Sequence, residues 1–177
     1  MKFKSHVFDE KAISRSIVRI AHEITEKNET TDDLIIAGIK TRGVPIAHRI
    51  ADCIYEKIDN TKKIPVIVLD ITGFRDDVKK DTAPSAQNIS ETVEGKTVIL
   101  TDDVICTGRT ARAAMDALIS LGRPGKIQLA VIVDRGHREL PIRADYVGKN
   151  IPTSKNESIE VKLKETDGIE MIDIYEK

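Results

Sequence analysis

The chain has 177 residues and a mass of 19.7 kDa, which suffices for one domain with a full hydrophobic core and is short for two. Hydrophobic residues make up 40% of it and charged residues 32%, a composition that excludes intrinsic disorder. The formal net charge of −1 excludes a global attraction to nucleic acid, so any such binding must depend on a local basic patch.

The sequence contains no segment that predicts export or membrane insertion. Residues 1–6 lead straight into charged residues, without the apolar region of a signal peptide or a membrane span, so we expect a cytoplasmic protein with no membrane partner. Cys53 and Cys106 are too few for a disulfide framework, and neither has the spacing of a metal ligand. Cys53 shares a helical face with Ile46 and Ile50, which predicts a place in the core.

The first part of the chain alternates helical patterns with short apolar runs. Residues 9–28 carry isoleucines at helical spacing, with Asp9 available as a cap, and predict an amphipathic helix. Residues 34–39 form a continuous apolar run, typical of a strand buried on both faces, and residues 46–58 return to helical spacing. Residues 66–71 form the next buried run.

Residues 73–96 are polar. A structureless stretch of this length is unusual inside a compact domain, so we expect a lid or hairpin over a functional site.

The second part of the chain continues the alternation. Residues 97–101 predict a third buried strand, residues 109–121 an alanine-rich helix, and residues 127–133 a fourth strand. Residues 158–163 and 170–175 are weaker alternating segments. Strands interleaved with helices predict an α/β fold with a mainly parallel sheet flanked by helices, in one domain spanning residues 1–177.

The segment with the clearest chemistry joins the third strand to the next helix. It reads Thr101-Asp102-Asp103-Val104-Ile105-Cys106-Thr107-Gly108-Arg109-Thr110. The two carboxylates lie at the carboxyl end of a central strand, where open parallel sheets bind ligands. Residues 107–110 can wrap backbone N–H groups around a phosphate at a helix N-terminus, and Gly108 permits the close approach. Because carboxylates repel phosphate, they must face another part of the ligand, such as sugar hydroxyls, which indicates a ribose 5-phosphate.

Simpler interpretations of the acid pair are a metal site, a helix cap or a solvated corner. The strict succession of acid pair, threonine-glycine loop and helix favours the phosphate site. Two other phosphate motifs, G-x-x-x-x-G-K-[ST] and G-x-G-x-x-G, do not occur in the sequence.

Residues 98–110 resemble the phosphoribosyl pyrophosphate (PRPP) binding motif of type I phosphoribosyltransferases. Residues 38–43, 74–77 and 133–145 extend the resemblance to the bacterial family of pyrimidine-operon attenuation regulators that are also uracil phosphoribosyltransferases. Two positions depart from this family: Cys106 stands where tyrosine is usual, and Thr101 where an aliphatic residue is common.

The resemblance implies the type I phosphoribosyltransferase fold, with a flexible lid and a small hood. It also implies a reaction in which uracil displaces diphosphate from PRPP to give UMP, with Mg²⁺ bound through PRPP and no direct metal ligand from the protein. The residues expected to be catalytic are Asp102, Asp103, Arg42 and Arg75. Those expected to bind PRPP or UMP are Thr41, Arg42, Asp102, Asp103, Val104, Ile105, Cys106, Thr107, Gly108, Arg109 and Thr110. The base would lie near Val133, Asp134, Arg135 and Ile159.

Two basic sets are candidates for an RNA surface. One lies on residues 9–28, opposite the isoleucines, and the other lies within residues 135–155. Aromatic residues are only 3% of the chain and tryptophan is absent, so the surface is no stacking platform for single strands. The resemblance implies binding of a hairpin in pyrimidine-operon leader mRNA, strengthened by UMP or other uridine nucleotides. The candidate residues are Arg15, Arg19, His22, Arg138, Arg143, Lys149 and Lys155.

Three functions remain open from the sequence. The first is the dual regulator and uracil phosphoribosyltransferase; the second is a salvage phosphoribosyltransferase for another nucleobase without RNA regulation. The third is a non-catalytic RNA regulator that uses the nucleotide site as a sensor. The resemblance also implies a homodimer or higher homo-oligomer.

Overall fold

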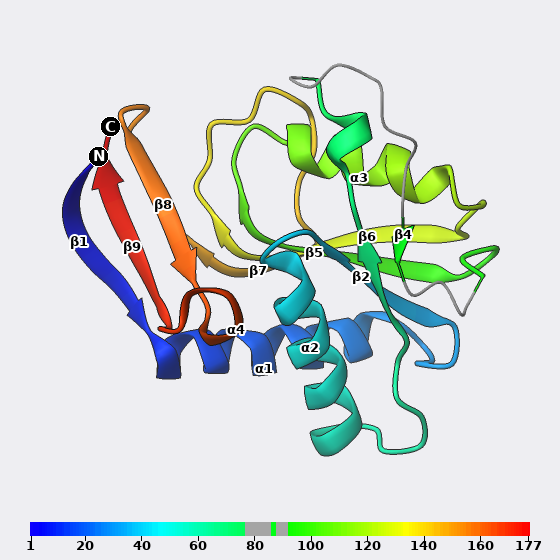
Figure 1. Ribbon diagram of the computed structural model, residues 1–177. Helices are drawn as coiled ribbons and strands as arrows, with labels where there is room; N and C mark the ends of the chain where they lie inside the picture. Colours follow the sequence, from blue (N-terminus) through cyan, green and yellow to red (C-terminus); the bar gives the residue numbers. More distant parts are fainter. Residues whose placement is uncertain (77–85, 88–91) are drawn as a thin grey trace.

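The computed structural model describes residues 1–76, 86–87 and 92–177, so the middle of the predicted lid lies outside the described residues. A six-stranded sheet forms its centre, in the order β4-β3-β2-β5-β6-β7 (Figure 1). Five strands are parallel, and β4 runs antiparallel to β3. The strands are β2 (Leu34–Ile39), β3 (Val66–Leu69), β4 (Ala86–Gln87), β5 (Thr97–Ile105), β6 (Lys126–Asp134) and β7 (Tyr146–Asn150). The predicted fold class is confirmed.

Helices cover both faces of the sheet. The helices α1 (Glu10–Lys27) and α2 (Gly43–Lys57) pack on one face, and α3 (Arg109–Ile119) packs on the other. Strand β2 is buried along its whole length because it contributes to both cores: Ile36 packs with α1 and α2, whereas Ile35 and Ala37 pack with α3. Cys53 is 6% exposed within the first of these cores, as predicted.

The helix ends follow local chemistry. Asp9 caps α1 by accepting a 2.8 Å hydrogen bond from the Ala12 N–H, as predicted. Helix α2 begins at Gly43, three residues before the predicted start, because the apolar periodicity on which the prediction rested begins at Ile46. Helix α3 begins after Gly108, whose φ of 92° lies in the left-handed region that glycine adopts readily.

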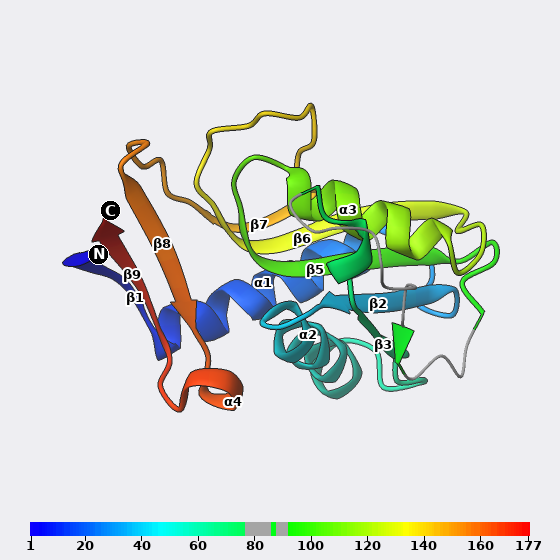
Figure 2. The ribbon, with the colours of Figure 1, turned by 45° about the horizontal axis from the view of Figure 1, so that its top comes forward.

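A second, antiparallel sheet stands beside the carboxyl edge of the central sheet (Figure 1, Figure 2). It consists of β1 (Lys2–Asp9), β9 (Met171–Glu176) and β8 (Glu157–Lys162), in that order, and the short helix α4 (Lys164–Asp167) joins β8 to β9. We call β1, β8, α4 and β9 the hood. The sequence did not predict β1, because irregular register near Phe3 and His6 breaks the alternation expected of a strand.

No helix in the described parts of the chain has the length and apolar character needed to span a membrane.

Candidate functional site

The aspartate pair lies inside strand β5, not after it. The pairing with β2 reaches Thr101, opposite Gly38, whereas the pairing with β6 continues to Ile105, opposite Asp134. The predicted strand end at Thr101 was therefore wrong by four residues. The aspartates interrupt the apolar run from which the end was predicted, but backbone pairing with β6 carries the strand onward.

Both carboxylates are half-buried and turned back onto their own backbone. Asp102 Oδ1 accepts a 2.9 Å hydrogen bond from the Asp103 N–H, and Asp103 Oδ1 accepts a 2.7 Å bond from the Val104 N–H. Burial raises the pKa of both carboxyl groups, and the neighbouring charge of Asp103 raises the pKa of Asp102 further. A pair held in this way favours ligands that bring hydroxyl donors or positive charge.

The loop after β5, residues 107–110, borders a small phosphate-sized hollow, and we call it the phosphate loop. A cavity of about 60 Å³ is lined by Asp102, residues 104–108, Thr110 and neighbouring apolar side chains. Gly108 lies against Leu140 and Ile142, where an added Cβ would be 3.4 Å from each of their Cβ atoms. The backbone N–H groups at the start of α3 stand at the rim of this hollow, as an anion site requires.

A second loop, after β2, adjoins the first. Its peptide bond between Lys40 and Thr41 is cis. The Thr101 hydroxyl, fully buried, donates a 2.8 Å hydrogen bond to the Gly43 carbonyl, and a Cβ on Gly43 would lie 2.2 Å from the Thr101 carbonyl oxygen. Thr101, which stands where an aliphatic residue is common in the family, thus has a structural role, because its hydroxyl joins the two loops.

Arg42 extends from this second loop to the hood. It donates from Nε and Nη2 to Asp167 at 3.2 and 2.8 Å, a two-point ion pair. Its charge also lowers the pKa of Asp103 against the stronger effect of burial. This contact could not be predicted from the sequence, because Asp167 lies 125 positions away in the chain.

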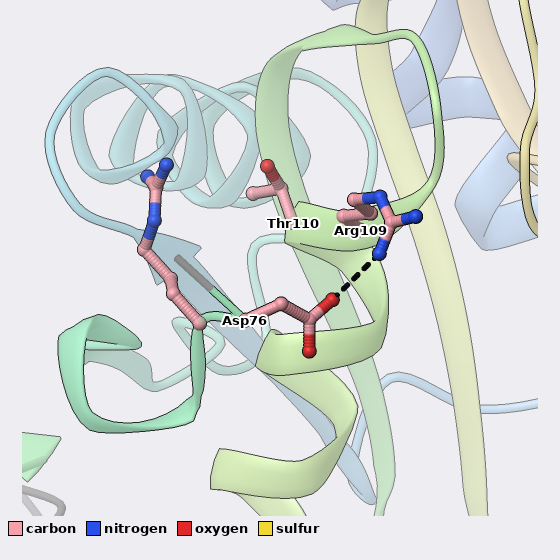
Figure 3. Close-up of a pocket in the computed structure, with 4 residues that line it drawn as sticks. Asp76, Arg109 and Thr110 are labelled. Atoms are coloured by element: carbon pink, nitrogen blue, oxygen red, sulfur yellow. Dashed lines mark hydrogen bonds and ion pairs between the residues drawn. The ribbon is translucent and has the colours of Figure 1, made fainter. Parts of the chain in front are cut away.

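The residues at the base of the predicted lid face the start of α3. Arg75, Asp76, Arg109 and Thr110 line a cavity of about 130 Å³, where Asp76 and Arg109 form a 2.9 Å ion pair (Figure 3). Arg112 also binds Asp76, at 3.0 Å. The structure thus brings Arg75 into the same neighbourhood as the phosphate loop.

The predicted base pocket lies between β6 and the hood. The Val133 side chain is fully buried, while Arg135 donates to the Glu157 carbonyl at 2.7 Å and so joins β6 to β8. Ile159 packs on the same core cluster as Val133. The Asp134 carbonyl and the Arg135 N–H already bond to Ile151 and Ile105, so uracil recognition there stays a prediction.

The two basic sets meet where α1 lies along β7. Arg19 donates to the backbone carbonyls of Val147, at 2.9 Å, and Gly148, while Arg15 and His22 are exposed beside it on α1. Further exposed basic residues on or near β7 are Arg143, Lys149 and Lys155.

Arg138 differs from the rest of its set because its donors are used inside the protein. It binds the Asp134 carboxylate and the carbonyls of Ile142, at 2.7 Å, and Cys106, at 2.8 Å. It therefore holds the segment before β7 against the phosphate loop. A direct contact of Arg138 with RNA stays a prediction.

The described residues contain no group of three or more His, Cys, Asp or Glu that could hold a metal ion. The phosphoribosyltransferase family generally uses Mg²⁺ together with PRPP. The half-buried pair Asp102 and Asp103 fits such a ligand, because a bound cation offsets the cost of burying two adjacent carboxylates.

Comparisons with known proteins agree with this geometry. The model of the phosphoribosyl transferase domain family matches residues 5–166. The chain is 56% identical over 180 residues to "Bifunctional protein PyrR" of Thermoanaerobacter sp. (strain X514), with 100% of both chains covered. It is 53% identical over 184 residues to the protein of that name from Bacillus pumilus (strain SAFR-032), again with 100% of both covered.

Solved structures show the same fold at much lower identity. The hypoxanthine phosphoribosyltransferase of Trypanosoma cruzi superposes with a TM-score of 0.74 at 17% identity, covering 98% of this chain and 97% of that one. A hypoxanthine-guanine phosphoribosyltransferase from Bacillus anthracis gives 0.70 at 17% identity, with 98% of each chain covered. The chain belongs to the phosphoribosyl transferase family and, within it, to the bifunctional PyrR proteins.

Proposed function

We propose that this protein is a UMP-responsive, RNA-binding regulator of pyrimidine biosynthesis genes that also makes UMP from uracil and PRPP. The observation that carries the proposal is the carboxyl edge of β5, where a carboxylate pair and a phosphate-sized hollow adjoin on consecutive residues. Full-length relatives named as bifunctional proteins support a second activity beside the enzymatic one.

In the enzymatic reaction the loop of residues 107–110 holds the 5-phosphate. Asp102 and Asp103 accept hydrogen bonds from the ribose hydroxyls and stabilise the positive charge that develops on the sugar as diphosphate leaves. The two aspartates adjoin the phosphate loop, so a single ligand can place its phosphate in the loop and its ribose hydroxyls against the carboxylates. The anchored sugar then needs to move little between diphosphate and uracil.

The diphosphate end of PRPP would lie at the second loop, against Thr41 and Arg42, and Arg75 would reach it from the base of the lid. Mg²⁺ would accompany PRPP, bound through its oxygens, and supplies charge neutralisation there. The direct hydrogen bond between Thr101 and Gly43 supports this arrangement, because it fixes the second loop beside the carboxylates.

The RNA surface would consist of the exposed basic residues of α1 and of the segment around β7. Phosphate contacts from arginine and lysine supply affinity, and arginine can also read bases in a folded loop. Contacts of residues 138–142 with the phosphate loop support a link between the two sites: Glu139 and Leu140 both donate backbone hydrogen bonds of 3.0 Å to the Thr107 carbonyl. A nucleotide in the loop would thereby bias the surface that binds the leader mRNA hairpin.

One experiment tests both activities in the same preparation. UMP formation is measured with uracil and PRPP, with hypoxanthine in place of uracil as the matched control. Binding of a pyrimidine-operon leader hairpin is then measured with and without UMP over a salt series, against a hairpin of scrambled loop sequence. Activity with hypoxanthine alone would favour the salvage enzyme, and equal binding of both hairpins would contradict the regulatory role.

A cytoplasmic location and a homodimeric or higher homo-oligomeric state complete the proposal. The charged residues that follow residues 1–6 support the location, and the family resemblance supports the oligomer. Light scattering coupled to size-exclusion chromatography gives the mass of the assembly, and a mass near 19.7 kDa would contradict the second.

A further inference from the structure

The hood reaches the second loop through one carboxylate. Asp167, at the end of α4, accepts from Arg42 Nε and Nη2 with its two oxygens, at 3.2 and 2.8 Å. The same carboxylate accepts a 2.9 Å hydrogen bond from the Leu163 N–H and a 2.7 Å bond from the Thr166 hydroxyl. Hydrogen bonds from Arg42, and then from these two groups, hold the pKa of Asp167 well below its usual value. The acceptor is therefore charged and fixed in orientation.

The ion pair with Asp167 uses the Nε–Nη2 edge of the Arg42 guanidinium and leaves the Nη1 donors unused. An arginine has five N–H donors in a planar fork, and Asp167 takes those of the Nε–Nη2 edge. Arg42 Nη1 makes no hydrogen bond with any residue that the structure describes. Arg42 is also close enough to Asp103 to lower its pKa. The remaining donors of Arg42 are thus available on the loop beside the carboxylate pair.

Another arginine, Arg49 of α2, anchors the hood independently of Arg42. Arg49 lies two helical turns after Arg42, on the same helix face. It binds Glu165 at 2.7 Å through Nε and Nη2, and Glu170 at 2.6 Å through Nη1. Loss of Asp167 would therefore leave α4 attached to α2 through Arg49, while freeing the Arg42 side chain to rotate.

We propose that Asp167 is a positioning residue that fixes the Arg42 guanidinium for the diphosphate of the incoming sugar substrate. A hood carboxylate would thus set the affinity for a ligand that carries diphosphate and leave the affinity for a nucleoside monophosphate unaltered. This inference rests on the proposed function, because it takes the second loop as the diphosphate site. It assigns to the hood a role in substrate selection as well as in covering the site.

Asp167→Asn is the most selective change. Asparagine keeps one oxygen for the Leu163 N–H and Thr166 hydroxyl, but it has no charge and sets an NH₂ group against a guanidinium edge. Glu165→Gln is the matched control, because it removes the same charge from the same helix at a partner of Arg49. Asp167→Glu keeps the charge and tests for rescue, and thermal unfolding checks that all three variants fold.

Four quantities are measured for each protein: the kcat for UMP formation, the KM for PRPP, the Kd of magnesium diphosphate and the Kd of UMP. For Asp167→Asn we expect the KM for PRPP and the Kd of diphosphate to rise about tenfold, with kcat changed less and the Kd of UMP unchanged. Glu165→Gln should match the wild type in all four quantities, and Asp167→Glu should recover part of the loss.

The inference is overturned if Asp167→Asn behaves like Glu165→Gln, or if its affinities for UMP and diphosphate weaken together. Tighter diphosphate binding would also overturn it, because Asp167 would then compete for Arg42. A wild type that forms no UMP and binds no diphosphate would overturn the proposed function itself, a result distinct from a change confined to the variant.

Discussion

The candidate phosphate site consists of ten consecutive residues, 101–110, whereas the basic surface depends on a contact between Arg19 and Val147, which lie 128 positions apart. In the first region a strand end, a glycine and a helix start fix the geometry by local backbone preferences. In the second, the packing of α1 along β7 brings the charges together. A change in the first region should therefore act on catalysis and nucleotide binding, and a change in the second should act on RNA affinity through tertiary structure.

The largest expected effect tests whether catalysis can be lost while RNA binding is retained. Asp103→Asn removes a carboxylate that faces developing positive charge in the proposed reaction, so kcat for UMP formation should fall about 10³-fold while RNA affinity without UMP stays unchanged. Steady-state kinetics and a filter-binding titration measure the two. Asp116→Asn, at an exposed position on α3, is the control. An equal loss of UMP formation and RNA binding would contradict the claim that the two regions act separately.

The next effect probes the junction of the two loops. Gly43→Ala would place a Cβ about 2.2 Å from the Thr101 carbonyl oxygen, so the second loop must move. We expect kcat/KM for PRPP to fall about 10²-fold, because small misplacements of binding groups are costly in catalysis. Gly95→Ala is the control: a Cβ there meets nothing within 4 Å, but the φ of 71° strains any side chain in this turn before β5. It should lower thermal stability and leave kcat/KM unaltered. Wild-type kinetics in Gly43→Ala would contradict a functional role for this loop geometry.

A smaller effect is expected on the basic surface. Arg19→Ala removes a charge and the bonds from α1 to β7, so the Kd for the leader hairpin should rise about tenfold and the salt slope should fall by about one. UMP synthesis should not change. Arg123→Ala, which alters net charge equally on the exposed loop after α3, is the control. Loss of synthesis in Arg19→Ala would show that the surface and the site are not separable.

The smallest expected effect concerns the pKa values of the carboxylate pair, Asp102 and Asp103. Burial raises the pKa of both groups, so each protonates at a higher pH than an ordinary aspartate, and activity that needs the ionised pair should be lost earlier on acidification. In Asp103→Asn the neighbouring charge is gone but burial remains, so the pKa of Asp102 should fall only part of the way toward its ordinary value. Carboxyl NMR titration measures this change, and an unaltered Asp102 would contradict the coupling.

The sequence predicted most of the central sheet because its strands are buried on both faces. Leu34 to Ile39 form a strand whose six residues are all buried, and an uninterrupted apolar run is the direct sign of that environment. The end of β5 was less predictable, because Asp102 and Asp103 are polar yet lie in the strand. Pairing with β6 decides that boundary, and a single sequence does not contain this information.

The part of the candidate site that is formed by neighbouring residues in the chain could be predicted from the sequence. The part that is formed by residues far apart in the chain could not. The sequence indicated residues 101–110 as a candidate phosphate site, and their role stays a prediction. The contacts of Arg42 with Asp167 and of Arg135 with Glu157 could not be predicted, because both depend on where the hood docks. Arg138 is the opposite case. The local excess of basic residues predicted that it belongs to the RNA surface, but in the structure it donates to the Cys106 carbonyl and the Asp134 carboxylate.

Strand β1 pairs with β9, so that Lys2 lies opposite Glu176. During synthesis on the ribosome, β1 is made long before β9 and has no partner strand until β9 has been made. The parallel strands between Leu34 and Asn150 can pair much earlier, because they are closer in sequence. The nascent chain would therefore acquire its phosphate loop before its hood. A protein that ends just before β9 would therefore contain the loop after β5, but its hood sheet would lack its middle strand.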